Sequence, residues 1–143
     1  MTRDIANELI TEYDLILEGS DNFETRYLVN EIAVAQQKPM VSGALSQWEG
    51  QISVFDPARN GPCYRCIFPE KPTDGLAPSC AEAGVFAPLP GVIGSMMASE
   101  AMKLIIKTGS TLTGSMMIYD AHFGETRQIR LNKRADCPVC AHA

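Results

Sequence analysis

Four of the five cysteines in this 143-residue chain form two pairs with the same spacing. Cys63 and Cys66 lie near the middle of the chain, and Cys137 and Cys140 lie near its end. A C-x-x-C pair brings two thiolates to one point from a tight turn, and two pairs complete a tetrahedral shell of four sulfurs around zinc. The sequence therefore predicts a structural zinc ion, bound by all four cysteines, that ties the middle of the chain to its end.

Disulfides and a thioredoxin-like redox motif are the alternatives to zinc. A redox C-x-x-C lies at the start of a helix that follows a strand, and we do not predict that setting for Cys63. Disulfides are typical of small secreted domains. The first residues, 1–5, contain no apolar signal core. We therefore expect a cytoplasmic, reducing compartment, which favours thiolates held by a metal.

Composition narrows the class of protein further. The length suits one domain, and 45% hydrophobic residues are ordinary for a globular protein. A net charge of −5 without a cluster of Lys and Arg argues against nucleic acid as the main partner. No apolar run approaches the ~20 residues that span a bilayer, so no membrane partner is expected.

The hydrophobic periodicity predicts an α/β domain. Helices are expected over 5–13, 23–37 and 91–107, and strands over 14–19, 39–43, 51–55, 116–120 and 126–131. The first two strands should be parallel because a helix connects them. The third alternates polar and apolar residues and should have one exposed face, and the last two should form a hairpin. Residues 56–90, which hold the first cysteine pair, are expected to be irregular.

A chain that opens on a partial helix and then a β-α-β unit is typical of the second half of a doubly wound domain. The sequence contains no G-x-G-x-x-G motif and no P-loop. If a nucleotide is used, its phosphate-binding half is therefore expected outside this chain. We predict the C-terminal part of a Rossmann-like sheet, with mixed and antiparallel strands, as one partial domain over 1–143.

Several short motifs occur together in the order found in one family. They are Ser20-Asp21-Asn22, Glu49-Gly50-Gln51, Gly61-Pro62-Cys63-Tyr64-Arg65-Cys66, Cys80 with Glu82-Ala83-Gly84, and Tyr119-Asp120-Ala121. The chain resembles the C-terminal half to two-thirds of the ThiF/MoeB/HesA adenylyltransferases, which are bacterial relatives of ubiquitin-activating enzymes. The resemblance covers nearly all 143 residues.

The resemblance implies an activity, cofactors and partners. Members of this family use ATP and Mg²⁺ to adenylate the C-terminal glycine of a ubiquitin-like sulfur-carrier protein that ends in Gly-Gly. They serve molybdenum-cofactor or thiamine biosynthesis, and they are commonly homodimers. A cysteine desulfurase or a rhodanese is a further expected partner.

The resemblance also points to residues of a nucleotide site. Asp21 matches the aspartate that the family uses with Mg²⁺ and the ATP phosphates, and it follows a predicted parallel strand, where ligands bind in open α/β sheets. The alternative role for Asp21 is the N-cap of the next helix, and both roles can coexist. Asn22 matches the next motif position as a nucleotide contact. Arg26 and Asn30 match too, but we interpret them as a local brace.

Cys80 is the unpaired cysteine, and two roles stay open for it. The family position lies on a crossover loop, where the thiolate in some branches attacks the adenylate or forms a disulfide-type link during sulfur transfer, as a thioester or persulfide route requires. A lone cysteine can equally be a small buried hydrophobe. Trp48 and Tyr64 are expected to pack around the cysteine pair.

Three hypotheses for the function follow. The first is an enzyme part that does not adenylate alone, because the family's glycine-rich loop and the Arg and Lys that hold the triphosphate are absent from the sequence. The second is a non-catalytic, zinc-stabilised module that binds a sulfur carrier or a partner enzyme. The third is a zinc-ribbon redox or regulatory protein.

Overall fold

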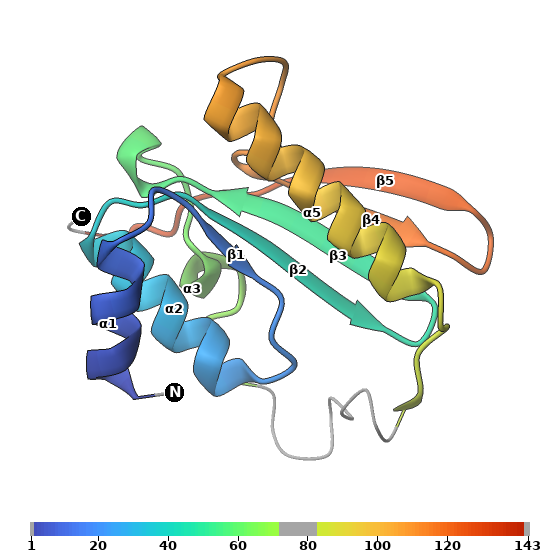
Figure 1. The fold of residues 1–143 in the computed structure, drawn as a ribbon, viewed down its shortest axis with the longest axis horizontal. Helices are drawn as coiled ribbons and strands as arrows, with labels where there is room; N and C mark the ends of the chain where they lie inside the picture. Colours follow the sequence, from blue (N-terminus) through green and yellow to red (C-terminus); the bar gives the residue numbers. More distant parts are fainter. Residues whose placement is uncertain (1, 72–82, 142–143) are drawn as a thin grey trace.

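A computed structural model describes residues 2–71 and 83–141, and it shows a five-stranded mixed sheet with helices on both faces (Figure 1). The strands follow one another in chain order across the sheet: β1 (Ile16–Glu18), β2 (Met40–Ser46), β3 (Glu49–Phe55), β4 (Ser115–Asp120) and β5 (Glu125–Arg130). β1 and β2 are parallel, and the other neighbours are antiparallel. The predicted mixed sheet, its parallel first pair and its final hairpin are confirmed.

Helices cover the two faces of the sheet unequally. One face carries α1 (Arg3–Thr11), α2 (Phe23–Ala35) and the single turn α3 (Tyr64–Ile67), and the other carries α5 (Leu89–Ile106). The two faces arise from the alternation of side chains along each strand. Met40 pairs with Phe55 and both face α2, whereas their neighbours Val41 and Val54 pair on the face under α5.

α5 packs its side chains directly over glycines of the two strands beneath it. A Cβ on Gly43 would lie 2.2 Å from Sδ of Met97, and a Cβ on Gly50 would lie 2.3 Å from Cδ1 of Ile93. A larger side chain at either position would require the side chain of Met97 or Ile93, or α5 itself, to shift. These two glycines therefore set the distance between α5 and the sheet.

α5 is also the one helix among the described residues that is long and apolar enough to cross a membrane by length and composition alone. Leu89, Ile93 and Met97 bury one face of it against β2 and β3. The same length and composition occur in core helices, so the burial of this face accounts for part of its apolar character. Met102, Ile105 and Ile106 remain exposed near its C-terminal end.

Two details of the sequence prediction are wrong. β3 does not expose one face, because its residues from Ile52 to Phe55 are all buried between α5 and the α2–α3 layer. Residues 56–90 are not irregular throughout, since they contain the 3₁₀ turn η1 (Pro57–Arg59), α3 and the start of α5. Alternation of polar and apolar residues does not show which side chains of a central strand are exposed, because a polar side chain can be buried when it is hydrogen-bonded. The hydroxyl of Ser53, for example, donates to the carbonyl of Ser115 at 2.7 Å.

Candidate functional site

The four paired cysteines converge into one buried cluster, as predicted. Their sulfurs all lie within 4.8 Å of one another. Cys63 lies immediately before α3 and Cys66 lies inside it, while Cys137 and Cys140 belong to the turns after β5. Val34 of α2 packs against the cluster, with partly buried Ile67, Val139 and Ala141 around it. The cluster thus joins the middle of the chain to its end.

The distances between the sulfurs fit one tetrahedral metal ion. Cys63 Sγ lies 4.0 Å from Cys66 Sγ and 3.7 Å from Cys137 Sγ, and Cys66 Sγ lies 3.3 Å from Cys140 Sγ. Zn–S bonds of about 2.3 Å give a tetrahedron whose edges are about 3.8 Å long. All four cysteines are free thiols rather than disulfides. The donor set and its spacing therefore suit zinc.

Two neighbours orient this shell. Asn30, which is buried on α2, accepts a hydrogen bond from the backbone N–H of Tyr64 at 2.8 Å, and its amide nitrogen lies 3.8 Å from Cys63 Sγ. The backbone N–H of Arg134 points to Cys66 Sγ at 3.4 Å. Such donors hold sulfur ligands in place and stabilise their negative charge. Asn30 is thus a brace, but it braces the cysteine cluster rather than Arg26.

The thiols differ in how readily they lose a proton. Burial raises the pKa of Cys63 to about 11, because the thiolate loses hydration. Burial acts in the same direction on Cys137, but hydrogen bonds from the backbone N–H groups of Cys140 and Val139 outweigh it and lower the pKa of Cys137 to about 7. A bound metal requires all four thiolates, so its binding must release protons.

Two expectations about the first cysteine pair are wrong. Cys63 is the N-cap of α3, so the pair does lie at the start of a short helix that follows β3 and η1. Trp48 does not pack near the cluster; it lies in the β2–β3 turn and stacks on Phe86. Tyr64 does lie in the adjoining core, where its ring contacts Phe55 and Phe68.

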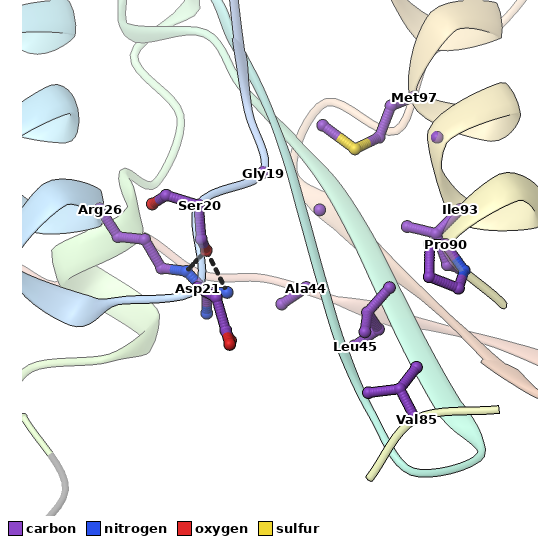
Figure 2. A pocket seen from close by; sticks show the side chains of 12 residues that line it. Gly19, Ser20, Asp21, Arg26, Ala44, Leu45, Val85, Pro90, Ile93 and Met97 are labelled. Atoms are coloured by element: carbon purple, nitrogen blue, oxygen red, sulfur yellow. Dashed lines mark hydrogen bonds between the residues drawn. The ribbon is translucent and has the colours of Figure 1, made fainter. Parts of the chain in front are cut away.

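A cavity lined by described residues, which we call the main cavity, lies between the sheet and α5. It has a volume of about 460 Å³, within the range of small-molecule sites. Figure 2 shows Ser20, Asp21 and Arg26 on one side of it and residues of α5, among them Ile93 and Met97, on the other. The polar side follows the carboxyl end of β1, where open α/β sheets bind ligands. Asp21 therefore follows the carboxyl end of a parallel strand, as expected, and its role with Mg²⁺ and ATP stays a prediction.

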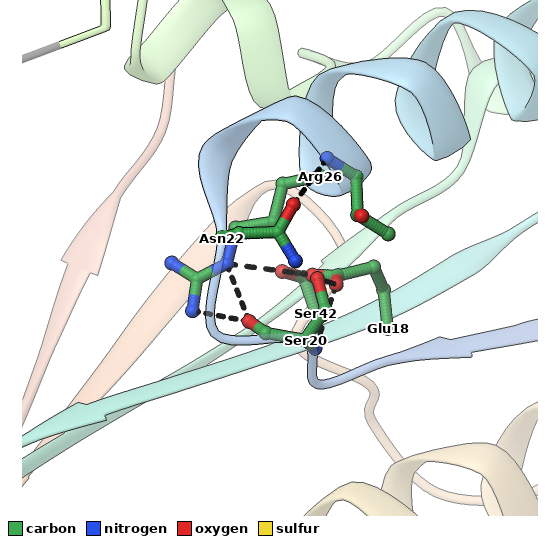
Figure 3. A network of polar contacts seen from close by, with 6 residues as sticks. Glu18, Ser20, Asn22, Arg26 and Ser42 are labelled. Carbon is green, nitrogen blue, oxygen red and sulfur yellow. Dashed lines mark hydrogen bonds and ion pairs between the residues drawn. The ribbon is translucent and has the colours of Figure 1, made fainter. Parts of the chain in front are cut away.

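A buried carboxylate, which the sequence prediction missed, organises the loop that carries Asp21 (Figure 3). Glu18, the last residue of β1, is only 4% exposed. It accepts hydrogen bonds from the N–H of Ser20 at 2.8 Å and from the Ser20 hydroxyl, and its other oxygen lies 3.9 Å from Nε of Arg26. The sequence did offer an indication, because Glu18 is a charged residue at the end of an otherwise apolar strand. Acids are rarely buried unless they have a partner, so such a residue indicates a polar network.

Arg26 closes the other side of this loop. Its Nε and Nη2 donate to the carbonyl of Ser20 at 2.9 and 2.7 Å. Asn22 caps α2 by accepting from the N–H of Thr25 at 2.8 Å. The helix cap is thus Asn22 and not Asp21, while Arg26 is a brace, as predicted, although its target is the loop. Glu18, Arg26 and Asn22 together fix the backbone on both sides of Asp21.

Replacing Glu18 with Gln tests this organisation. The amide keeps the shape but loses the charge that faces Arg26, so we expect the free energy of unfolding to fall by ~2 kcal/mol. Urea denaturation measures this change, and amide hydrogen exchange should show faster exchange at residues 19–22. Glu31→Gln is the matched control, because the Arg3–Glu31 pair lies at the surface and should contribute less than ~0.5 kcal/mol. Equal losses in both variants contradict the assignment.

The remaining predicted site residues stand as follows. Cys80 lies outside the described residues, so no geometry bears on its two alternative roles. Asn22 has its side-chain oxygen engaged in the helix cap. Its assignment as a nucleotide contact stays a prediction.

Comparisons with known proteins find a matching family and several similar proteins. The profile of the ThiF family matches residues 1–139. The sulfur carrier protein adenylyltransferase of Thermus thermophilus is 47% identical over 144 residues, which cover 98% of this chain and 53% of that protein. The SAMP-activating enzyme E1 of Haloferax volcanii is 42% identical over 135 residues, which cover 94% of this chain and 49% of that protein. The chain thus spans about half the length of these relatives.

A solved structure shows the same fold. E. coli MccB, in a crystal structure with ATP, superposes with a TM-score of 0.74 over 96% of this chain and 43% of the MccB chain, at 17% identity. That identity supports the fold alone. The family match over residues 1–139 and the identity to the curated relatives extend the likeness to the sequence itself, and this chain belongs to the ThiF family.

Proposed function

We propose that this chain is the C-terminal part of an ATP-dependent adenylyltransferase that activates the C-terminal glycine of a ubiquitin-like sulfur carrier. The observation that carries the proposal is the position of Asp21. Its carboxylate lies at the polar side of the main cavity, after the carboxyl end of a parallel strand, in a loop fixed by Glu18 and Arg26. The similar Thermus protein is named a sulfur carrier protein adenylyltransferase, and the similar Haloferax protein is named a SAMP-activating enzyme E1.

The chemistry assigns simple tasks to the residues of this chain. The carrier carboxylate attacks the α-phosphorus of ATP, the bond to pyrophosphate breaks, and an acyl-adenylate and pyrophosphate result. Asp21 offers the hard oxygen ligand that Mg²⁺ prefers, and Asn22 contacts the nucleotide. The apolar part of the cavity is lined by Gly43, Gly94 and Ile93, and it accommodates the C-terminal tail of the carrier, which carries no bulky side chains.

The four-cysteine site is proposed to hold a structural zinc ion. Four thiolates leave no open position for water, so zinc there stabilises the fold and takes no part in adenylation. A covalent role for Cys80 in later sulfur transfer belongs to the same proposal. The proposal also includes a cysteine desulfurase or rhodanese as sulfur donor, a homodimer and a cytoplasmic location. The carrier is proposed to serve molybdenum-cofactor or thiamine biosynthesis.

Pyrophosphate exchange tests the proposed function. We expect no exchange from the 143-residue chain with carrier and ATP, because its sequence contains no glycine-rich phosphate loop and catalysis needs positioned cations around the phosphates. Fusing the preceding half of the Thermus relative to this chain should create exchange activity. Robust exchange by the chain alone contradicts the proposed incompleteness.

Asp21→Asn in the active fusion tests the site. Loss of the metal-binding charge should lower the exchange rate by ~100-fold or more. Asp14→Asn is the control, because Asp14 is an exposed acid just before β1 and should leave the rate unchanged. An Asp21 variant as active as the control contradicts the assignment of Asp21.

A further inference from the structure

Tyr64 is part of the first cysteine pair and also reaches the polar network around the loop that carries Asp21. It follows Cys63 directly in the chain and is the first residue of α3, which also contains Cys66. The residue is buried, with only 3% of its surface exposed. A metal ion bound by both cysteines holds the backbone on either side of Tyr64, so the place of its side chain depends on that site.

Two residues of α2 hold the two ends of Tyr64. Asn30 accepts a hydrogen bond from the backbone N–H of Tyr64 at 2.8 Å, and its amide nitrogen lies 3.8 Å from Cys63 Sγ. At the other end, the side chain of Arg26 hydrogen-bonds with the Tyr64 hydroxyl, and the charge of Glu18 acts on this hydroxyl as well. Residues that are four apart lie on the same face of a helix. Arg26 and Asn30 therefore bind the same neighbour from successive turns of α2.

Packing leaves the Tyr64 ring little freedom between these two ends. The ring meets Tyr27 edge to face, with 5.6 Å between centroids, and it lies 4.7 Å from the ring of Phe68. It also lines a small cavity together with Ser42, whose hydroxyl lies 3.5 Å from the carboxylate of Glu18. Figure 3 shows Ser42 beside Glu18 in the network behind the loop. The ring thus extends from the cysteine cluster to this polar network.

We propose that Tyr64 is a positioning residue of the nucleotide site, because its hydroxyl holds Arg26 against the loop that carries Asp21. Zinc binding and nucleotide binding are then coupled through this side chain. The inference rests on the proposed function, which assigns Mg²⁺ and ATP to that loop. Arg26 donates to the carbonyl of Ser20 at 2.9 and 2.7 Å, and a guanidinium has five N–H donors, so it can bind both partners at once. A loop held in this way needs no reordering when the nucleotide binds.

Coupling between two binding sites is reciprocal. If the zinc-bound form of α3 places Tyr64 correctly, Mg²⁺–ATP binds more tightly to the zinc-bound protein. Zinc must then be held more tightly, by the same factor, when Mg²⁺–ATP is bound. Couplings of this kind usually amount to about 5-fold or more. Zinc itself stays outside the reaction, since its effect reaches Asp21 only through side chains of the protein.

Tyr64→Phe removes the hydroxyl and keeps the ring, so it tests the contact with Arg26 without opening a large cavity. In the zinc-loaded 143-residue chain, we expect amide hydrogen exchange at residues 19–22 to become about 10-fold faster, the size expected when a buried hydrogen bond to a charged group is lost. Tyr27→Phe is the matched control. It removes a hydroxyl of the same layer, which donates to the carbonyl of Phe68 at 3.1 Å, and it should leave exchange at residues 19–22 unchanged.

Two measurements on the active fusion extend the test to the nucleotide. In pyrophosphate exchange, Tyr64→Phe should raise the KM for ATP by about 10-fold and change kcat less, because a poorly held loop lowers the fraction of protein that is ready to bind. Without carrier, Mg²⁺–ATP should raise the concentration of a zinc-selective chelator that removes half of the zinc by at least about 5-fold. This increase should be lost in Tyr64→Phe and kept in Tyr27→Phe.

The outcomes separate this inference from the proposed function. Equal hydrogen exchange at residues 19–22 in the two variants overturns the inference and leaves the proposed function standing. A zinc affinity that Mg²⁺–ATP leaves unchanged in the unmodified fusion has the same consequence. Loss of zinc or of folding in Tyr64→Phe assigns the hydroxyl a structural role only and also overturns the inference. A fusion that is inactive in pyrophosphate exchange overturns the proposed function and, with it, the nucleotide role of Tyr64.

Discussion

Replacing Cys63 with Ser is expected to abolish zinc binding and to lower the free energy of unfolding by more than ~4 kcal/mol. Cys63 belongs to the first cysteine pair, and its sulfur lies 3.7 Å from that of Cys137, a separation that suits one shared metal ion. A hydroxyl is a poor substitute for thiolate as a zinc ligand, and the loss of one ligand releases the chain segment after β5. Metal content by atomic emission and urea denaturation measure the two effects.

The control for this prediction is Cys80→Ser, which changes the one cysteine that belongs to neither C-x-x-C pair. It should keep one zinc per chain and near-normal stability. A Cys63→Ser protein that retains full zinc and full stability contradicts the proposed metal site. Lowering the pH should also release zinc from the unmodified chain, because protons compete for the four thiolates.

Replacing Gly50 with Val is expected to be the next most damaging change, with a loss of ~3 kcal/mol. A Cβ at this position would lie 2.3 Å from Cδ1 and 2.4 Å from Cγ1 of Ile93, so the Ile93 side chain or α5 must be displaced. Since Ile93 also lines the main cavity, the displacement should change the site as well as the stability. Thermal denaturation measures the loss of stability. The emission wavelength of Trp48, which is two residues from Gly50 in the sequence, reports the change in local structure.

The matched control is Gly91→Ala in the first turns of α5. A Cβ there meets no atom within 4 Å, and alanine favours the helix over glycine, so stability should be unchanged or rise by up to ~1 kcal/mol. If Gly50→Val unfolds no more easily than Gly91→Ala, the tight contact between Gly50 and Ile93 does not limit the size of the side chain at position 50, which contradicts the prediction.

The order of the strands and helices was predictable because it depends on local patterns. A change of hydrophobic period marked β1, α2 and β2, and the connecting helix required their parallel pairing. The prediction of a half-exposed strand over 51–55 was wrong, because β3 is a central strand that is covered on both faces. Its buried Ser53 is hydrogen-bonded to Ser115 of another strand, a contact that no local pattern reveals.

The cysteine cluster was predictable from spacing, because two C-x-x-C pairs allow few other roles. Asp21 was predicted from its motif and its place after β1. The network behind it was not, since Glu18 and Arg26 meet only when the loop folds back on α2. The bracing of the cluster by Asn30, which was expected to pair with Arg26, likewise required the packing of α2 against α3.

The sequence by itself predicted the five strands, the long helices, the two cysteine pairs and the place of Asp21 after β1, because each of these is encoded by residues near one another in the chain. The tertiary structure alone decided what lies beside them. It packed α5 onto two glycines beside the cavity, and it stacked Trp48 of the β2–β3 turn on Phe86, which lies before α5. Contacts between distant segments depend on packing across the sheet, which local periodicity does not record.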